Sequence, residues 1–132
     1  MEDKIIVVDT DVIINHVNDQ SLSLTKYLKL QAKKEVSLVV SSVTVFEYYS
    51  SDSLVVQTKE EETNLMFSYF FKQPVNEEIA KKAASINRSY KLFGKIGLGD
   101  LFIGATTLYL QGSLLTENKK HFKLIPGIRF AK

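Results

Sequence analysis

At 132 residues and a formal net charge of +2, the chain has the length and charge balance of one ordinary globular domain, which we place over residues 1–132. Hydrophobic residues make up 45% of it and charged residues 24%, which excludes a disordered chain and a coiled coil. Cysteine is absent, which excludes disulfides, thiolate catalysis and cysteine-based zinc sites and predicts a reducing compartment, the cytoplasm.

The first half of the chain predicts strands that alternate with helices. Residues 4–8 (KIIVV) form a continuous β-branched run, which is typical of a central strand covered on both faces. The pattern is helical from Val12 to about Lys34, and residues 36–42 (VSLVVSS) predict a second strand that leads into another helix. This order is typical of a parallel sheet.

The alternation continues after the middle of the chain. The apolar stretch from Leu65 predicts a helix that gives way to a third short strand before Pro74. Asn76 then fits the N-cap of a further helix, whose apolar residues recur at steps of three and four. Gly94 is placed to close that helix.

A nearly apolar helix is predicted over residues 98–111, with Gly112 placed to end it. Asp100 and two threonines interrupt this richest apolar region, so no stretch reaches the roughly 20 residues that span a bilayer. We therefore expect a soluble protein without a membrane partner. Two last strands are predicted at 113–116 and 128–130.

These elements predict an α/β fold with a mostly parallel central sheet of four to five short strands and helices on both faces. In such sheets ligands bind beyond the carboxyl ends of the strands, near the point where the strand order reverses. Polar side chains that lie just past a predicted strand, or at a helix start, are expected to meet there. They are Asp9, Glu47, Asp100 and Asn118.

The acidic residues each have a structural explanation when they are taken alone. Asp9 and Asp11 follow the first strand and could cap the next helix, since Asp is favoured at helix starts. Thr44 and Glu47 have the spacing of a capping box, and such boxes are far commoner than metal sites. Asp100 could cap its own helix, although the glycines before it would let a ligand approach the backbone.

The joint placement of these residues at one edge of the predicted sheet favours a functional site over separate structural roles. Carboxylates packed together repel one another, so a folded site needs shifted pKa values or a divalent cation, and oxygen ligands suit Mg²⁺, with Mn²⁺ as a substitute. Asn118 could orient water or phosphate there, or form a local turn.

The histidines and the aromatic residues have structural explanations. His16 and His121 lack metal-ligand spacing and are expected to be structural. The aromatic residues of 46–49 and 65–71 are expected in the core or a subunit interface.

Four blocks of the sequence, in this order, resemble the successive blocks of PIN domains, and especially of the VapC toxins of toxin-antitoxin pairs: VVDTDVII, SVTVFE, GLGDLFIGATTL and LLTENKKHF. The resemblance spans nearly the whole chain. It implies that Asp9, Glu47 and Asp100 are the metal-binding acids. The fourth position of the family is often Asp, and here it is Asn118, which carries no charge and weakens the expectation of a second tightly bound metal.

The resemblance also implies an activity and partners. The activity is endoribonuclease cleavage, in which metal-activated water hydrolyses RNA phosphodiester bonds and Glu47 and Asn118 join the catalytic residues. The partners are an RNA substrate, a cognate antitoxin protein that covers the cleft, and a second copy in a homodimer. Residues beside the acids are candidates for contact with the substrate: Thr10, Asp11, Thr116, Lys119 and Lys120.

Two alternatives stay open at this stage. The segment from Asp9 to Asp11 also fits the Asp-x-Asp motif of haloacid-dehalogenase-like phosphatases, with Asp9 as nucleophile and Asp11 as acid and base. Against it, Gly104 stands where a further acid is often found in those enzymes. The second alternative is a non-catalytic PIN-like module that binds RNA or protein while its acids serve as helix caps.

Overall fold

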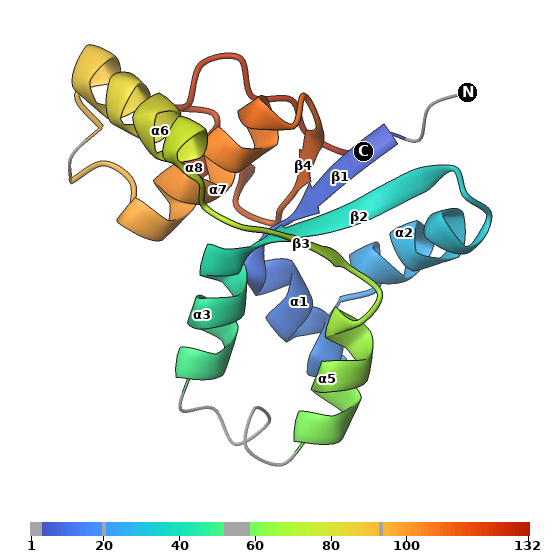
Figure 1. The fold of residues 1–132 in the computed structure, drawn as a ribbon. Helices are drawn as coiled ribbons and strands as arrows, with labels where there is room; N and C mark the ends of the chain where they lie inside the picture. Colours follow the sequence, from blue (N-terminus) through green and yellow to red (C-terminus); the bar gives the residue numbers. More distant parts are fainter. Residues whose placement is uncertain (1–3, 20, 52–58, 93) are drawn as a thin grey trace.

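The centre of the fold is a parallel sheet with the strand order β3-β2-β1-β4 (Figure 1). The computed structural model describes residues 4–19, 21–51, 59–92 and 94–132. The strands are β1 (Lys4–Val8), β2 (Val36–Ser41), β3 (Phe71–Gln73) and β4 (Ser113–Leu115). All three strand pairings are parallel, so the predicted α/β fold with a mostly parallel sheet is confirmed.

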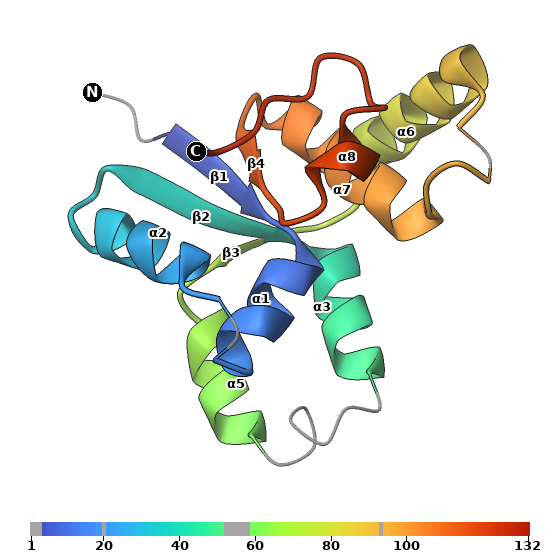
Figure 2. The same ribbon diagram turned by 180° about the vertical axis from the view of Figure 1, so that it is seen from behind.

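Helices cover both faces of this sheet (Figures 1 and 2). One face carries α1 (Thr10–Val17), α2 (Ser23–Ala32), α3 (Ser42–Ser50) and α5 (Glu60–Phe67). The other carries α6 (Glu77–Tyr90), α7 (Leu98–Tyr109) and the short α8 (Lys119–Phe122). Within the described ranges, no helix has both the length and the apolar character needed to cross a membrane.

Two hydrophobic cores hold these layers together, one on each face. Because successive side chains of a strand point to opposite faces, Ile6 and Val8 of β1 pack in the core under α1 and α2, while Val7 packs in the core under α6 and α7. β2 divides its side chains in the same way, with Leu38 on the first face and Val39 on the second. The continuous apolar runs of both strands therefore reflect burial on both faces.

Two predicted elements have different limits in the structure. The helical stretch predicted from Val12 to about Lys34 is two helices, because the chain turns after α1 at Asp19, whose φ is 58°. The strand predicted at 128–130 is reduced to a single bridge between Leu114 and Phe130, so the described part of the sheet has four strands. The partner strand β4 is only 3 residues long, which leaves little edge to pair with.

The helix α6 begins as predicted and ends earlier than predicted. The Asn76 side chain accepts a hydrogen bond from the Ile79 N–H at 2.8 Å and so caps the helix. The end is not at Gly94, because Lys91 already takes the left-handed conformation, with a φ of 50°. Phe93, which fits the apolar spacing of this helix, lies outside the described residues.

Gly112 has a different role from the predicted one. The left-handed residue after α7 is Gln111, with a φ of 55°, so the helix does not need Gly112 to end. A Cβ at Gly112 would instead lie 2.8 Å from the carbonyl oxygen of Ile5 in β1. The glycine therefore lets the chain before β4 lie close against β1.

Candidate active site

The predicted polar residues gather where the carboxyl ends of β1, β2 and β4 meet. The strand order reverses between β1 and β4, and the Asp9 N–H donates a hydrogen bond to the Leu115 carbonyl across that point, at 2.9 Å. Glu47 comes from α3, which follows β2, and Asp100 from the first turn of α7. Burial raises the pKa of both Asp9 and Glu47, and the charge of Asp100 raises both further, so the acids act on one another electrostatically.

Asp9 is the most buried of these acids, with 3% of its surface exposed. Its Oδ1 accepts a hydrogen bond from the Thr10 N–H at 2.8 Å, and its Oδ2 accepts one from the Thr116 hydroxyl at 2.8 Å. Asp9 is also the N-cap of α1. The capping explanation is therefore correct for Asp9, and it leaves the carboxylate at the sheet edge.

Burial raises the pKa of Asp9 from 3.8 to about 7. The hydrogen bond from Thr116 lowers this pKa, and the nearby charges of Asp11 and Asp100 raise it. The Asp9 carboxyl group therefore changes between its protonated and ionised forms near neutral pH, whereas an exposed aspartate is ionised throughout that range.

Glu47 is not part of a capping box, which corrects the structural explanation given for it from sequence. The helix begins earlier, and its N-cap is Ser41, whose hydroxyl accepts a hydrogen bond from the Val43 N–H at 3.0 Å. Glu47 instead turns toward α1, where its Oε1 accepts a hydrogen bond from the Thr10 hydroxyl at 2.7 Å. Burial, followed by the charges of Asp100 and Asp11, raises the pKa of Glu47, while the Thr10 bond lowers it.

Asp100 faces a histidine that the sequence interpretation had counted as structural. The His121 Nδ1 lies 3.2 Å from Asp100 Oδ2 and 3.2 Å from the side-chain nitrogen of Asn118. Its Nε2 lies 2.7 Å from the Lys95 carbonyl oxygen, which can only accept, so Nε2 carries a proton. Burial raises the pKa of Asp100, and the neighbouring His121 lowers it.

The two threonines proposed from sequence as substrate contacts are buried. Thr10 is 7% exposed and Thr116 is 5% exposed, and their hydroxyls are hydrogen-bonded to Glu47 and Asp9. Thr116 also accepts a hydrogen bond from the Asn118 N–H at 2.9 Å. Both threonines therefore orient carboxylates, and their burial argues against direct contact with a substrate.

The remaining candidates lie at the surface. Asp11 and Lys120 are exposed, and the exposed Lys119 places its ammonium 5.9 Å from the centre of the Phe130 ring. Glu117 is also exposed and accepts a hydrogen bond from the Asn15 side chain, which links α1 to the segment after β4.

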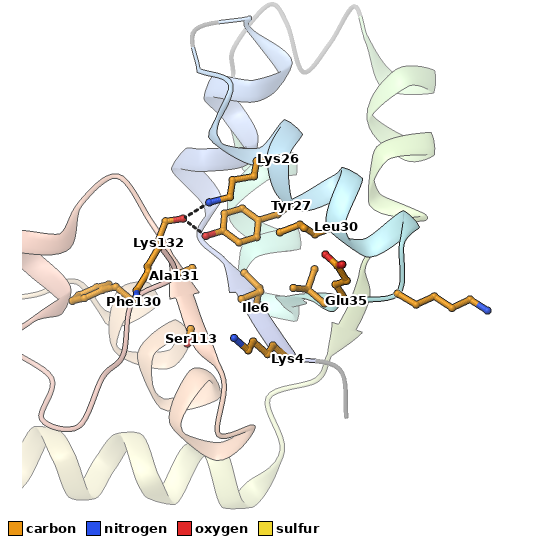
Figure 3. A pocket seen from close by; sticks show the side chains of 12 residues that line it. Lys4, Ile6, Lys26, Tyr27, Leu30, Glu35, Ser113, Phe130, Ala131 and Lys132 are labelled. Carbon is orange, nitrogen blue, oxygen red and sulfur yellow. Dashed lines mark hydrogen bonds between the residues drawn. The ribbon is translucent and has the colours of Figure 1, made fainter. Parts of the chain in front are cut away.

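A cavity of about 610 Å³ lies at the opposite edge of the sheet (Figure 3). The first residues of three strands, Lys4, Val36 and Ser113, line it, whereas the acids follow the last residues. The hydroxyl of Tyr27 and the ammonium of Lys26 both donate to the Lys132 carbonyl on its wall. This cavity is separate from the candidate active site.

The acids offer the oxygen donors that a hard divalent cation prefers. In this conformation, no group of three or more acidic or histidine side chains within the described residues is arranged to hold a metal ion. The chemistry of the donors still fits a cation, because Asp9, Glu47 and Asp100 are partly or fully buried carboxylates with raised pKa values. A divalent cation beside them would favour their ionised forms together.

Replacing Thr116 by valine is expected to raise the pKa of Asp9 further, by about one pH unit, because the variant loses a hydrogen bond to the ionised carboxylate. The carboxylate titration of Asp9, followed by NMR, should move upward accordingly. Thr107→Val is the matched control, since its buried hydroxyl donates within α7 to the Ile103 carbonyl. An unchanged Asp9 pKa in Thr116→Val would contradict the assignment of this hydrogen bond.

Comparison with known proteins identifies the family. The PIN domain model matches residues 6–127. Ribonuclease VapC10 of Mycobacterium tuberculosis (strain H37Rv) is 30% identical over 126 residues, which cover 94% of this chain and 90% of that protein. VapBC2 from Rickettsia felis, solved bound to a promoter DNA fragment, superposes with a TM-score of 0.83 at 22% identity, covering 96% of this chain and 97% of that chain. DNA-bound VapBC from Salmonella typhimurium superposes with a TM-score of 0.82 at 20% identity, covering 99% of this chain and 98% of that chain. The chain therefore belongs to the PIN-domain family and resembles its VapC members in both sequence and fold.

Proposed function

We propose that this protein is a divalent-metal-dependent endoribonuclease, with Mg²⁺ as the natural ion and Mn²⁺ as a substitute. The observation that carries the proposal is the set of three carboxylates with raised pKa values, Asp9, Glu47 and Asp100, at the switch point of a PIN-type sheet. The relative in Mycobacterium tuberculosis is named a ribonuclease, which supports RNA as the substrate class.

In this proposal the three acids hold the cation, and side chains around them fix their orientation. When bound, the cation would activate water and stabilise the charge on the phosphate. We propose that Glu47, whose Oε1 accepts a hydrogen bond from the Thr10 hydroxyl, orients the attacking water. Asn118 supplies an amide beside the acids and no charge.

The substrate backbone is proposed to reach the acids along the exposed side chains after β4. Lys119 and Lys120 begin α8 directly after Asn118 and carry the positive charge that a phosphate backbone requires. The exposed Asp11 lies in the first turn of α1, and its charge is among those that raise the pKa of the buried Asp9 after burial itself. We propose that Asp11 contacts a ribose hydroxyl or a bridging water, because its negative charge would repel a phosphate.

We further propose a role as the toxin of a toxin-antitoxin pair, which acts in the cytoplasm and assembles as a homodimer. Exposed apolar side chains on α3 and β3 support a protein partner, since Phe46 is 70% exposed and Phe71 is 62% exposed. The solved relatives are described as VapBC complexes, which supports an antitoxin as that partner. Sedimentation velocity of the purified chain tests the dimer, and a monomer at micromolar concentration would contradict it.

The two alternatives have less support. A haloacid-dehalogenase-like phosphatase would need Asp9 free to attack phosphorus, but both of its carboxylate oxygens accept hydrogen bonds and 3% of its surface is exposed. The PIN family match also argues against it. A non-catalytic module in which the acids serve as helix caps does not explain Glu47 and Asp100, because the N-caps of their own helices are Ser41 and Gly97.

The test is cleavage of a mixed pool of structured RNAs by wild-type protein and by Asp100→Asn, with Mg²⁺, with Mn²⁺ and with chelator. Wild type is expected to cut only with metal. Asp100→Asn is expected to lower the rate by more than about 100-fold, because groups that merely orient metal ligands already contribute 10–100-fold.

Asp19→Asn is the matched control, since it makes the same chemical change at an exposed position whose φ of 58° suits asparagine. Its cleavage rate should equal that of wild type. Metal-independent cutting, or equal rates for wild type and Asp100→Asn, would overturn the proposed site. Release of phosphate from small esters without RNA cleavage would favour the phosphatase.

A further inference from the structure

Helices α3 and α7 meet at a contact between Glu47 and Gly99, the residue before Asp100. The Glu47 carboxyl group lies against the backbone of Gly99. A Cβ built on Gly99 would have its three nearest atoms all in Glu47, with Cδ at 3.1 Å and Oε2 closer still. No real side chain tolerates such a separation, so this position accepts no side chain while Glu47 stays in place.

The backbone at Gly99 does not itself require glycine. Among the described glycines, positive φ values occur only at Gly94 and Gly127, so Gly99 has a conformation that other residues can adopt. Glycine within a helix also costs up to about 1 kcal/mol relative to alanine. The space that it leaves for the Glu47 carboxylate is therefore the structural feature that accounts for glycine at this position.

Glu47 is restrained on two sides. From α1, the Thr10 hydroxyl donates to Oε1 at 2.7 Å, and on the α7 side Oε2 rests against Gly99. The second restraint places Oε2 against the residue that directly precedes Asp100 in α7. Burial raises the pKa of Glu47, and the charge of Asp100 raises it further, so the two carboxylates interact electrostatically while Glu47 stays against Gly99.

We propose that Gly99 is a positioning residue for the metal site, because its missing side chain lets Glu47 reach from α3 to the side of Asp100. This inference rests on the proposed function, in which Glu47 is a metal ligand. Gly99 itself neither binds the metal nor touches the substrate. Its role is to leave the space that the Glu47 carboxylate occupies.

The test is Mn²⁺ binding to the full chain by isothermal titration calorimetry, with melting in chelator as the measure of folding. Gly99→Ala is expected to weaken Mn²⁺ binding by about 10–100-fold, the range seen when groups that orient metal ligands are lost. Its melting temperature in chelator should not fall, because the new methyl meets only the movable end of Glu47 and alanine favours the helix. Gly97→Ala is the matched control: a Cβ there has nothing within 4 Å, and Mn²⁺ affinity should stay at the wild-type value.

A second substitution separates positioning from general damage. Glu47→Asp shortens the acid by one methylene and makes room for a methyl at position 99. On its own it should weaken Mn²⁺ binding, but in the Gly99→Ala background it should cause little further loss, so that the two effects are not additive. Additive losses of Mn²⁺ affinity, or a Gly99→Ala protein that melts below wild type in chelator, would show a packing role and overturn the inference.

The outcome also distinguishes this inference from the proposed function. A wild-type chain that binds no Mn²⁺ and cuts no RNA would end the proposed function, whatever the variants do. A wild-type chain that binds Mn²⁺, together with Gly99→Ala that binds it equally well, would overturn the role of Gly99 alone.

Discussion

Replacing Asp9 by asparagine is expected to make the metal-free protein more stable at pH 8 while it removes the metal-dependent activity. Burial raises the pKa of Asp9 to about 7, so folding at pH 8 must keep an ionised carboxylate in a buried position. Asparagine is neutral there, and it caps a helix as well as aspartate does. The expected gain is about 2–4 kcal/mol in the free energy of unfolding, with a melting temperature at least about 5 °C higher.

The sign of this effect depends on pH. In the unfolded chain the Asp9 carboxyl ionises above its ordinary pKa of 3.8, whereas in the folded chain it keeps its proton up to about 7. The stability that wild type draws from this group is therefore fully present below about pH 4 and is lost as pH rises to about 7. Thermal melts in chelator should show a large gap between Asp9→Asn and wild type at pH 8 and a smaller one at pH 5. A variant that melts below wild type at pH 8 would contradict the raised pKa.

Mg²⁺ binding is expected to tighten by about tenfold between pH 6 and pH 8. A cation binds the ionised carboxylate, and Asp9 must release its proton first, which at pH 6 it mostly retains because its pKa is about 7. The raised pKa values of Glu47 and Asp100 act in the same direction. Calorimetry at pH 6.5 in two buffers of different ionisation enthalpy measures the protons released on binding.

Asp9→Asn gives the control for this linkage, because it removes the group with the pKa near 7. Its remaining Mg²⁺ binding should be weak and should depend less on pH than that of wild type. Asp19→Asn, whose change lies at an exposed position, should keep the full pH dependence. Binding to wild type that is equally tight at pH 6 and pH 8 would contradict a metal ligand at Asp9 with a pKa near 7.

The sequence predicted the order of elements and the edge at which the acids meet, and the reasons are local. The β-branched runs at 4–8 and 36–42 have the lengths and composition of buried strands, and both are strands in the structure. An acid that follows a parallel strand must lie at the carboxyl edge, so the place of Asp9 followed directly from its position in the chain.

The parts that could not be predicted depend on contacts between distant segments. His121 of α8 follows Asn118, the N-cap of that helix, at a spacing of three, a signal that both face one side, but only the fold brings that side to Asp100. The capping box failed for a local reason, because Ser41 and Thr44 are both good caps and the helix starts after the first of them. The close approach of Glu47 to Gly99 joins two helices and has no sequence signature at all.

The hydrogen bond from Thr116 to Asp9 joins residues 107 positions apart, almost the full length of the chain. During synthesis on the ribosome, Asp9 therefore emerges 107 residues before its partner Thr116. Until β4 has left the exit tunnel and paired with β1, Asp9 lacks its hydroxyl donor and the edge of the sheet beside it is open. The Asp9 carboxylate therefore gains its hydroxyl partner only after the ribosome has released Thr116, so the order of synthesis delays the orientation of this acid.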